Sequence, residues 1–549
     1  MIAIISFIGF TALVAIIAYL ATRKTDEKSS DGYFLAGRSL TAGVIAGSIL
    51  LTNLSTEQIV GLNGQAYTEG ILVMAWETLA AIAMVITALF LLPRYLKQGL
   101  TTISEFLADR FDVATKTLTS GLFLTGYAIV LLPVILYSGS VAIVGMFDIP
   151  LLLNITETQA IWITVWGIGI VGSVYAIFGG LKAVAVSDTI NAIGLLTGGL
   201  LIPIFGLVAI GNGSLIEGIS ALTESNPEKF KSLGDETASV PFTTIFTGLM
   251  LVQLFYWGTN QQIIQRALGA KNLAEGQKGL MLAAFIKILG PLIVVLPGVI
   301  AYHLFEGTLD NADQAYPRLV REVLPNYFVG FFAAVLFGAI LSSFNSVLNS
   351  SVTLFGIDIY KQHINKSAGE SLVVKRGKTF GILLAIFAMF VAPFIANAGS
   401  LFAYLQEVNG IYSIPILTVF VIGYLTKRVP AIAGKIGIIS GSLLYIFSQF
   451  LLKPILVNNA LEKAKINGIT DEASLLLIEV EAYPHFLHIC AILFLMNAGI
   501  MLLIGRIWPS PKPYVQEYTK KVDIEPWQYV KPVGLVICLV VVAIYVYFA

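Results

Sequence analysis

Leu51-Thr-Asn-Leu-Ser-Thr-Glu-Gln58 interrupts an otherwise apolar segment with six polar side chains in seven consecutive positions. The residues from Val44 to Leu51 are mainly apolar or small, and the chain becomes apolar again from Ile59. An unpaired polar group at membrane depth costs several kcal/mol, so this segment must be buried in protein or line a cavity. The stretch therefore predicts a spanning helix that is broken near the middle of the membrane.

The composition is that of a helical membrane protein. Of the 549 residues, 57% are hydrophobic and 12% are charged, and apolar stretches long enough to span a bilayer recur along nearly the whole chain. The formal net charge is zero, so no nucleic-acid partner is expected. The two cysteines lie in separate apolar stretches, the four histidines lack zinc-ligand spacing, and no nucleotide-binding motif is present. These observations argue against a disulfide, a metal hydrolase and an ATP-driven pump, and no enzyme activity is expected.

Apolar stretches predict fourteen membrane spans, and the basic residues support that number. The spans are 2–21, 41–62, 70–92, 115–145, 158–178, 186–210, 241–261, 276–304, 327–359, 376–396, 400–425, 433–452, 484–506 and 530–548. Of the 33 Lys and Arg residues, 25 lie in, or at the edge of, alternate loops and seven lie in the opposite loops. The basic set begins with the loop 22–40, after the first span, and basic loops stay in the cytoplasm. With an even number of spans, both termini are therefore predicted to be extracytoplasmic.

Polar residues at membrane depth concentrate in spans that are five helices apart. If the span around residues 51–58 is the first core helix, the polar span 241–261 is the sixth of ten. Two broken helices at corresponding positions predict an inverted repeat with the binding site where the breaks meet. The expected fold is therefore an all-α membrane protein of fourteen helices with a five-plus-five core. Its expected parts are residues 1–40, a first repeat 41–210, a second repeat 211–435, and three peripheral helices with their loops at 436–549.

A candidate cation site follows from the spacing of Ala339, Ser342 and Ser343, which share one helix face at i, i+3 and i+4. One carbonyl and two hydroxyls are oxygen ligands for a hard cation, and unwound carbonyls near Leu51 and Leu54 could supply the others. Sodium fits better than a divalent ion because no carboxylate cluster is present. The alternative is that the serines are small residues for close helix packing, with hydroxyls bonded to their own helix.

A second set of polar residues is suited to a solute. Its members offer amide, carboxylate and ammonium groups: Gln58, Glu77, Gln253, Lys287 and Gln406. Aromatic rings accompany them at Trp76, Tyr256, Trp257 and Tyr404. Donors and acceptors beside ring faces favour a neutral polyhydroxylated solute over a strong anion. The alternatives are a structural ion pair between Glu77 and Lys287, and plain core packing for the two tryptophans.

At these polar positions the sequence resembles the sodium/solute symporter family, most closely its bacterial sodium/sugar (glucose/galactose) branch. The similarity runs almost end to end. The matching stretches are Tyr33-Phe-Leu-Ala-Gly-Arg-Ser-Leu40, 53–58, Tyr175-Ala-Ile-Phe-Gly-Gly-Leu-Lys-Ala183, Tyr256-Trp-Gly258 to Ile263-Ile-Gln-Arg266, 287–298, Ala315-Tyr-Pro317 and Ala339-Ile-Leu-Ser-Ser343. The resemblance implies the fourteen-helix, inverted-repeat fold. It also implies a sodium ion held by the carbonyls of Leu51, Leu54 and Ala339 and the hydroxyls of Ser342 and Ser343.

The same resemblance implies roles for the remaining polar residues. Asp188 matches an acidic residue that helps sodium leave or borders a second site, for which Asn345 and Ser346 are the other candidates. Sugar contacts are implied at Gln58, Glu77, Lys287 and Gln406. Tyr256 matches an aromatic gate that Asn53 supports, and Trp257 and Trp76 complete the expected gate. Three residues depart from the galactose-transporting relative, namely Gln253 for asparagine, Ala80 for serine and Trp76 for tyrosine.

The sequence thus predicts sodium-coupled symport of a sugar, a hexose such as glucose or galactose, across the inner (cytoplasmic) membrane by alternating access. Na+ is the expected coupling ion. The expected partners are the sugar, the ion and membrane lipid, with no obligate protein partner. The alternatives are another small solute (a polyol, an amino acid, a vitamin or a sialic-acid-like anion) and a transporter-like sensor or pore.

Overall fold

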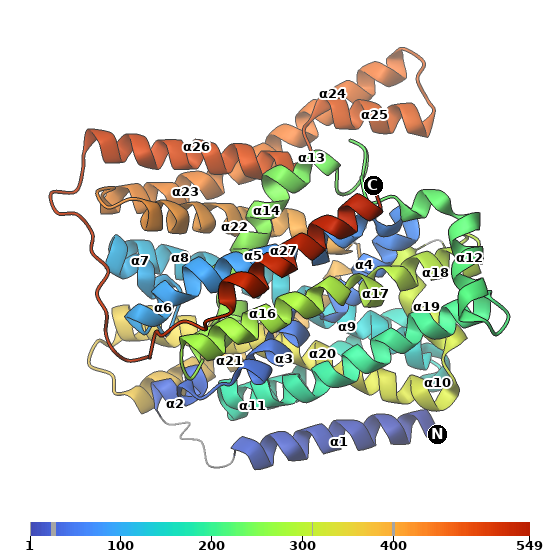
Figure 1. Ribbon diagram of the computed structural model, residues 1–549, viewed down its shortest axis with the longest axis horizontal. Coiled ribbons are helices and arrows are strands. Elements are labelled where there is room, and N and C mark those ends of the chain that lie inside the picture. Colours follow the sequence, from blue (N-terminus) through green and yellow to red (C-terminus); the bar gives the residue numbers. More distant parts are fainter. Residues whose placement is uncertain (1, 23–28, 310, 398–400) are drawn as a thin grey trace.

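A computed structural model describes residues 2–22, 29–309, 311–397 and 401–549, and these residues form a bundle of long helices (Figure 1). No β-strand occurs in the described parts of the chain, where the pairing of extended backbone is limited to two isolated bridges. The predicted all-α class is therefore confirmed. Both ends of the chain, together with α12 (Leu215–Ser225) and α25 (Glu472–Ala482), lie at the same end of the bundle in Figure 1.

The polar stretch at residues 51–58 breaks a helix, as predicted. Helix α3 (Ala42–Asn53) ends there and α4 (Thr56–Glu69) begins. Between them, Leu54 has φ −74° and ψ 56°, and Ser55 is extended with ψ 178°. These two residues leave the helical conformation, so the last carbonyls of α3 have no partner within that helix.

The span expected at 241–261 is broken as well. Helix α13 (Phe242–Thr244) leads through η6 (Ile245–Leu249) into α14 (Met250–Gly258), and α15 (Gln261–Leu268) follows after two residues. Asn260 has φ −77° and ψ 121°, and its side chain accepts a hydrogen bond from the backbone N–H of Gln262 at 3.2 Å. This cap starts α15 in a new direction. The two breaks thus occur in the two spans that the polar pattern singled out.

The rest of the first predicted repeat consists of long helices with local irregularities. In chain order they are η2 (Gly70–Met74), α5 (Ala75–Ile86), η3 (Thr87–Leu91), α6 (Leu92–Gln98), α7 (Ser104–Arg110), α8 (Val113–Gly126), η4 (Tyr127–Leu131), α9 (Leu132–Phe147), α10 (Ile149–Leu153) and α11 (Glu157–Ile210). Helix α11 covers two predicted spans and is kinked between them at Gly180, whose φ of 58° and ψ of −172° are not helical. A Cβ atom there would lie 3.0 Å from the ring of Tyr33, so both the backbone angle and the close packing require glycine.

The second predicted repeat continues with α16 (Leu273–Leu289), which bends by 45° into the short helices that follow it. These are α17 (Pro291–Val294) and α18 (Leu296–Leu304), and then come α19 (Ala315–Val323), α20 (Asn326–Thr353), η8 (Leu354–Ile364), α21 (Glu370–Val391), η9 (Ala392–Asn397) and α22 (Leu401–Leu425). A Cβ atom at Gly290, in the bend, would come within 2.3 Å of Glu77 Oε2. The missing side chain at Gly290 therefore makes room for the Glu77 carboxylate.

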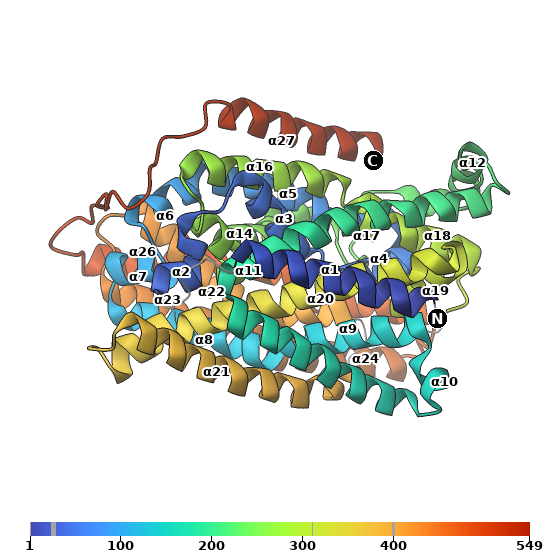
Figure 2. The same ribbon diagram turned by 90° about the horizontal axis from the view of Figure 1, so that it is seen from below.

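Peripheral helices surround this core. Helix α1 (Ile2–Thr22) packs on α11 and α20, and α27 (Val530–Tyr547) packs on α5 and α16, on the opposite face from α21 (Figure 2). The other peripheral elements are α2 (Ser30–Leu35), η1 (Ala36–Arg38), η5 (Pro227–Phe230), η7 (Ala312–Gln314), α23 (Ala431–Ile446), η10 (Phe447–Leu452), α24 (Lys453–Ile466) and α26 (Phe486–Ile507).

By length and apolar composition, ten helices of the described residues could cross a membrane, or eleven if the bent pair in 273–304 is one span. Three shorter apolar helices, Ile5–Leu20, Ala42–Asn53 and Phe242–Gly258, fall below the length of a full span. Two of them belong to the broken helices or lead into them. The structure thus supports a protein with many spans, while the number fourteen stays a prediction.

Candidate functional site

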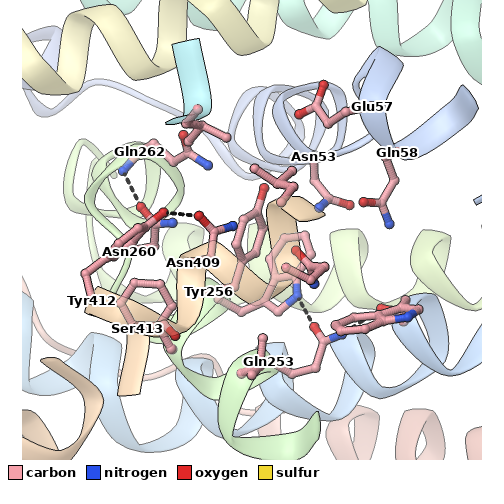
Figure 3. Close-up of a pocket in the computed structure, with 17 residues that line it drawn as sticks. Asn53, Glu57, Gln58, Gln253, Tyr256, Asn260, Gln262, Asn409, Tyr412 and Ser413 are labelled. Carbon is pink, nitrogen blue, oxygen red and sulfur yellow. Dashed lines mark hydrogen bonds between the residues drawn. The ribbon is translucent and has the colours of Figure 1, made fainter. Parts of the chain in front are cut away.

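A cavity lies between the two helix breaks and α22 (Figure 3). Seven of the predicted site residues line it: Asn53, Gln58, Trp76, Gln253, Tyr256, Trp257 and Gln406. The α3–α4 break contributes Asn53 and Gln58, whereas α14 contributes Gln253, Tyr256 and Trp257. Figure 3 shows Asn53 and Gln58 in the upper part of the view and Gln253 in the lower part. The cavity is therefore where the breaks meet, as the repeat pattern predicts.

Glu77 and Lys287 lie just behind this cavity and do not line it. Their side chains form an ion pair and are 0% and 1% exposed, respectively. Gln58 Nε2 donates to Glu77 Oε1 at 2.6 Å, and Lys287 Nζ also donates to Asn53 Oδ1. A buried ion pair needs such additional hydrogen bonds to offset the desolvation of both charges. In this conformation Gln58 and Asn53 separate the charged pair from the cavity.

Gln253 is held by hydrogen bonds at both ends of its amide. Its Nε2 donates to the carbonyl of Trp76 at 2.8 Å, and its Oε1 accepts from Trp257 Nε1 at 2.9 Å (Figure 3). The indole of Trp257 is 1% exposed and lies edge-on to the Tyr256 ring, with 5.1 Å between ring centroids. Gln253 thus links the two tryptophans that were expected to belong to the gate.

Tyr404 does not belong to this group. It lies on the exposed side of α22, where its side chain is 41% exposed. With Ile129 and Phe450 it lines a separate apolar hollow. Its neighbour Gln406 does face the cavity. The prediction that the Tyr404 ring accompanies the solute-binding residues is therefore wrong, because the two residues point to different sides of the helix.

An outer hollow adjoins the cavity, and the two spaces share lining residues. Trp76 and Gln406 line both spaces, and the outer one adds Glu236, Lys453 and Tyr483 from segments near α24 and α25. Those segments lie at the end of the bundle that also carries both termini (Figure 1). Trp76 and Gln406 therefore stand between the cavity and that end of the protein.

The predicted sodium ligands come together where α3 ends against α20. Leu51, Leu54 and Ala339 are at most 2% exposed, and Ser342 and Ser343 are each 2% exposed. Ser343 Oγ donates to the carbonyl of Thr52 at 3.0 Å, which ties α20 to the break. Within the described residues Ser342 Oγ makes no hydrogen bond of normal geometry, and the Asp188 carboxylate lies near it. A buried hydroxyl close to carbonyls that lack partners within their own helix is a donor set that fits a hard monovalent cation.

Asp188, predicted to aid sodium release, lies close to this region. Its Oδ2 accepts from Ser48 Oγ at 2.6 Å, and its Oδ1 has no partner in the part of the chain that is described. The amide oxygen of Asn345 is likewise buried without a partner. The hydroxyl of Ser346 is engaged differently, since the guanidinium of Arg266 donates to it. Ser346 therefore faces a resident cation, whereas the other two residues keep unused oxygens.

Arg266 is buried although the charge pattern predicts a loop at its position. It lies between the predicted spans 241–261 and 276–304, where basic residues favour a cytoplasmic loop, but its side chain is 0% exposed. Its Nε donates to Ser48 Oγ at 3.2 Å, and Ser48 in turn binds Asp188. In the sequence, Arg266 is the basic residue near the end of an amphipathic helix, a pattern that is equally typical of an exposed arginine. Its place in the stretch that resembles the family does not show whether it is buried.

Several further polar residues line the cavity without an expected role. They are Glu57, Asn260, Gln262, Asn409, Tyr412 and Ser413. The hydroxyl of Tyr127 reaches in from η4 and donates to Asn260 Oδ1 at 2.6 Å. Polarity at membrane depth could have identified Asn260, Gln262 and Asn409. Tyr127 gave no such signal, because a tyrosine in an apolar span is common.

Comparison with known proteins places the chain in a family. Residues 33–441 match the sodium:solute symporter family. The chain is 45% identical to a protein described as the uncharacterized symporter YidK of Escherichia coli (strain K12), covering 99% of this chain and 90% of that one. It is 33% identical to the sodium/glucose cotransporter of Vibrio parahaemolyticus, covering 78% of this chain and 81% of that one.

A solved structure supports the fold. The structure of a Na+-coupled sialic acid symporter in a substrate-bound, outward-open state matches with a TM-score of 0.72 at 18% identity. The match covers 94% of this chain and 99% of that one. Sodium is accordingly the coupling ion, and the fold is that of membrane transporters. On the match across residues 33–441 and the two relatives above 30% identity, this chain belongs to the sodium:solute symporter family.

Proposed function

We propose that this protein uses a sodium gradient to carry a neutral sugar, a hexose such as glucose or galactose, into the cell by alternating access. The observation that carries the proposal is the cavity at the two helix breaks, lined by amides and aromatic rings, beside a separate set of buried oxygens. The 33% identity to a sodium/glucose cotransporter supports the same solute class.

Sodium is proposed to bind between the end of α3 and α20, at the carbonyls of Leu51, Leu54 and Ala339 and the hydroxyls of Ser342 and Ser343. An ion held by two helices stabilises the arrangement in which those helices are close. If that arrangement also binds sugar more tightly, the ion and the sugar assist each other's binding, and this differential affinity couples the two gradients. Asp188 and Asn345, with their unused oxygens, are proposed to receive the ion as it leaves or to border a second site.

The sugar is proposed to bind against Gln58, Gln253 and Gln406. Glu77 and Lys287, which lie behind the cavity wall, are proposed to contact the sugar once Gln58 moves away from Glu77. When Gln58 turns toward a sugar hydroxyl, it must release Glu77 Oε1, so the buried ion pair responds to the occupied cavity. Tyr256 and Trp257 offer ring faces and Asn53 and Trp76 complete the gate. Ring faces suit a pyranose, whose C–H bonds form an apolar surface.

We further propose that the chain lies in the inner (cytoplasmic) membrane with both termini outside. The position of both ends at one end of the bundle supports an even number of spans (Figure 1). We propose the division into residues 1–40, 41–210, 211–435 and 436–549, and each of the two proposed repeats contains one of the helix breaks. The protein is proposed to act as a transporter without enzymatic activity, nucleic acid or an obligate protein partner.

Uptake of labelled solutes into proteoliposomes tests the proposal. The panel is glucose, galactose, myo-inositol, an amino acid and a sialic acid, each with an inward sodium or potassium gradient. We expect accumulation of a neutral sugar under sodium alone. Equal uptake under potassium would contradict sodium coupling, preferred uptake of the sialic acid would contradict the neutral solute, and equilibration without accumulation would indicate a pore.

A further inference from the structure

The cavity contains a carboxylate, Glu57, that none of the proposed roles uses. Glu57 lies in the first turn of α4 and lines the cavity next to Gln58. It is 7% exposed, and its Oε2 makes no hydrogen bond of normal geometry in the described parts of the chain, although the hydroxyl of Ser55 lies near the carboxylate. Figure 3 shows Glu57 and Gln262 in the upper part of the cavity, away from Gln253. An unpartnered buried carboxylate oxygen is costly, so a ligand that satisfies it is expected.

The other polar groups of the cavity show what kind of ligand is missing. Gln58 and Gln253 already use their amides on Glu77, Trp76 and Trp257. Among the lining atoms that are themselves buried, three have no hydrogen bond of normal geometry within the described residues, namely Glu57 Oε2, Gln262 Oε1 and Ser413 Oγ. Two of these three atoms can act solely as acceptors when Glu57 is ionised, and the third can accept or donate. A solute that fits them must bring several hydrogen-bond donors, as a polyol does.

The charge of the cavity also favours a neutral solute. Among the described lining residues, Glu57 is the one with a formal charge. The nearest cations are committed elsewhere, since Lys287 pairs with Glu77, and Arg266 donates to Ser48, Ser346 and the carbonyl of Gln262. A carboxylated solute in this cavity would meet a like charge at low dielectric, with no lining cation to offset the repulsion.

We propose that the Glu57 carboxylate contacts the solute directly, accepts hydrogen bonds from its hydroxyl groups, and excludes solutes that carry a carboxylate. This inference rests on the proposed sugar transport and deepens it by naming a specificity residue. Glu57 distinguishes neutral polyols from their acidic counterparts, while the proposed sodium ligands on α20 couple transport to the sodium gradient. The two functions are carried by different residues and are separable by substitution.

The test compares wild type with Glu57→Gln, which keeps size and removes charge, and Glu57→Asp, which keeps charge and shortens reach. Each reconstituted protein is assayed for the KM of the transported sugar, inhibition by the matching uronate (glucuronate for glucose, galacturonate for galactose), and half-activation by sodium. Glu407→Gln is the matched control, since Glu407 pairs with Lys453 outside the cavity.

For Glu57→Gln we expect the KM for sugar to rise about tenfold or more, because a hydrogen bond to a charged acceptor is lost. The uronate should become a competitive inhibitor, and half-activation by sodium should stay unchanged. Glu57→Asp should also raise the KM but keep the uronate excluded. Glu407→Gln should match wild type in all three measurements.

Other outcomes overturn the inference. An unchanged KM with the uronate still excluded removes Glu57 from the solute site, and a shift confined to sodium half-activation assigns it to a cation. If both Glu57 variants fail to fold, the wild type provides the test. Inhibition of its sugar uptake by the uronate as strongly as by the unlabelled sugar would overturn the inference. Wild-type transport of a neutral or cationic non-sugar would overturn the proposed sugar but not the role of Glu57, whereas transport of a carboxylated solute would overturn both.

Discussion

The sodium region (Leu51, Leu54, Ala339, Ser342 and Ser343) and the solute cavity adjoin the same helix break, but their polar groups are used differently. In the sodium region, Ser342 Oγ makes no hydrogen bond of normal geometry among the described residues, and the carbonyls at the end of α3 lack intrahelical donors. In the cavity, Gln58 and Gln253 are bound to neighbouring residues. An ion bound at the proposed ligands would need few existing hydrogen bonds to break, whereas a solute that binds Gln58 or Gln253 must replace the bonds that those amides already make. This difference favours an order in which sodium binds first.

The largest expected effect comes from removing the cation behind the cavity. Lys287→Ala leaves the Glu77 carboxylate buried and unpaired, which costs about 3–5 kcal/mol of stability. We expect sugar uptake to be lost, together with a lower thermal unfolding temperature of the purified protein. The double variant Glu77→Gln/Lys287→Met separates structure from function, since it should recover stability. Normal uptake by that double variant would show that the ion pair has no part in solute binding.

The next effect concerns the sodium region. Ser343→Ala removes one proposed ligand and the hydrogen bond to the Thr52 carbonyl. We expect the sodium concentration for half-maximal uptake to rise about tenfold, equivalent to about 1.4 kcal/mol, with a smaller change in the KM for sugar at saturating sodium. Ser351→Ala on the same helix is the control, because Ser351 bonds the carbonyl of Val347 in its own helix. An unchanged sodium response of Ser343→Ala would favour the packing interpretation of the serine pair.

A moderate effect is expected from the internal hydrogen bonds of the cavity. Gln253→Ala removes the acceptor of the Trp257 indole N–H and the donor to the Trp76 carbonyl. The KM for sugar should rise about fivefold to tenfold, because the tryptophans lose their link and the buried N–H loses its partner. Tryptophan fluorescence should show a sugar-dependent change that differs from that of wild type. A variant with wild-type KM and fluorescence would place Gln253 outside solute recognition.

The smallest effect lies outside both regions and provides a baseline. At the start of α8, burial tends to raise the pKa of Asp112, but hydrogen bonds from Lys435 and Thr115 outweigh it and hold the pKa below its usual value. A lowered pKa in the folded state stabilises the protein above the pKa of the unfolded state, and this contribution disappears as the pH falls through the folded value.

Because Asp112 and Lys435 are each 31% exposed at their side chains, the contribution should be below about 1 kcal/mol. The measurement is the difference in thermal unfolding between wild type and Asp112→Asn, which keeps the helix cap. A small difference at pH 7 should shrink as the pH falls below about 4, the usual pKa of an aspartate, and continue to shrink through the lower folded-state pKa. A difference that grows on acidification would contradict the assignment.

The helix break and its partner could be predicted from the sequence because their cause is local. Six polar side chains between residues 52 and 58 cannot face lipid, whatever the rest of the chain does. Asn260 and Gln262, in or at the end of the span five helices later, likewise cannot face lipid. The serine pair on α20 followed from helical periodicity. Each of these inferences needs just the residues of one segment and the cost of burying polar groups in lipid.

The positions of Arg266, Glu77 and Tyr404 could not be read in the same way. Arg266 is buried because Ser48, Ser346 and the carbonyl of Gln262 receive its guanidinium, and these partners come from three different elements. Glu77 is sealed off by Gln58 and accommodated by Gly290. A residue's exposure depends on which helix packs beside it, and no single segment determines that.

By itself, the sequence determined that this chain is a helical membrane protein with two broken helices and a serine pair able to share an ion, because polarity and periodicity are properties of single segments. Tertiary structure decided which of those polar groups are free. It joined Gln58 and Gln253 to neighbours and placed Arg266 beside Ser346, and within the described residues it left Ser342 Oγ and Glu57 Oε2 without a hydrogen bond of normal geometry. Whether a buried polar atom can bind a ligand depends on the partners it already has, and those partners come from distant parts of the chain.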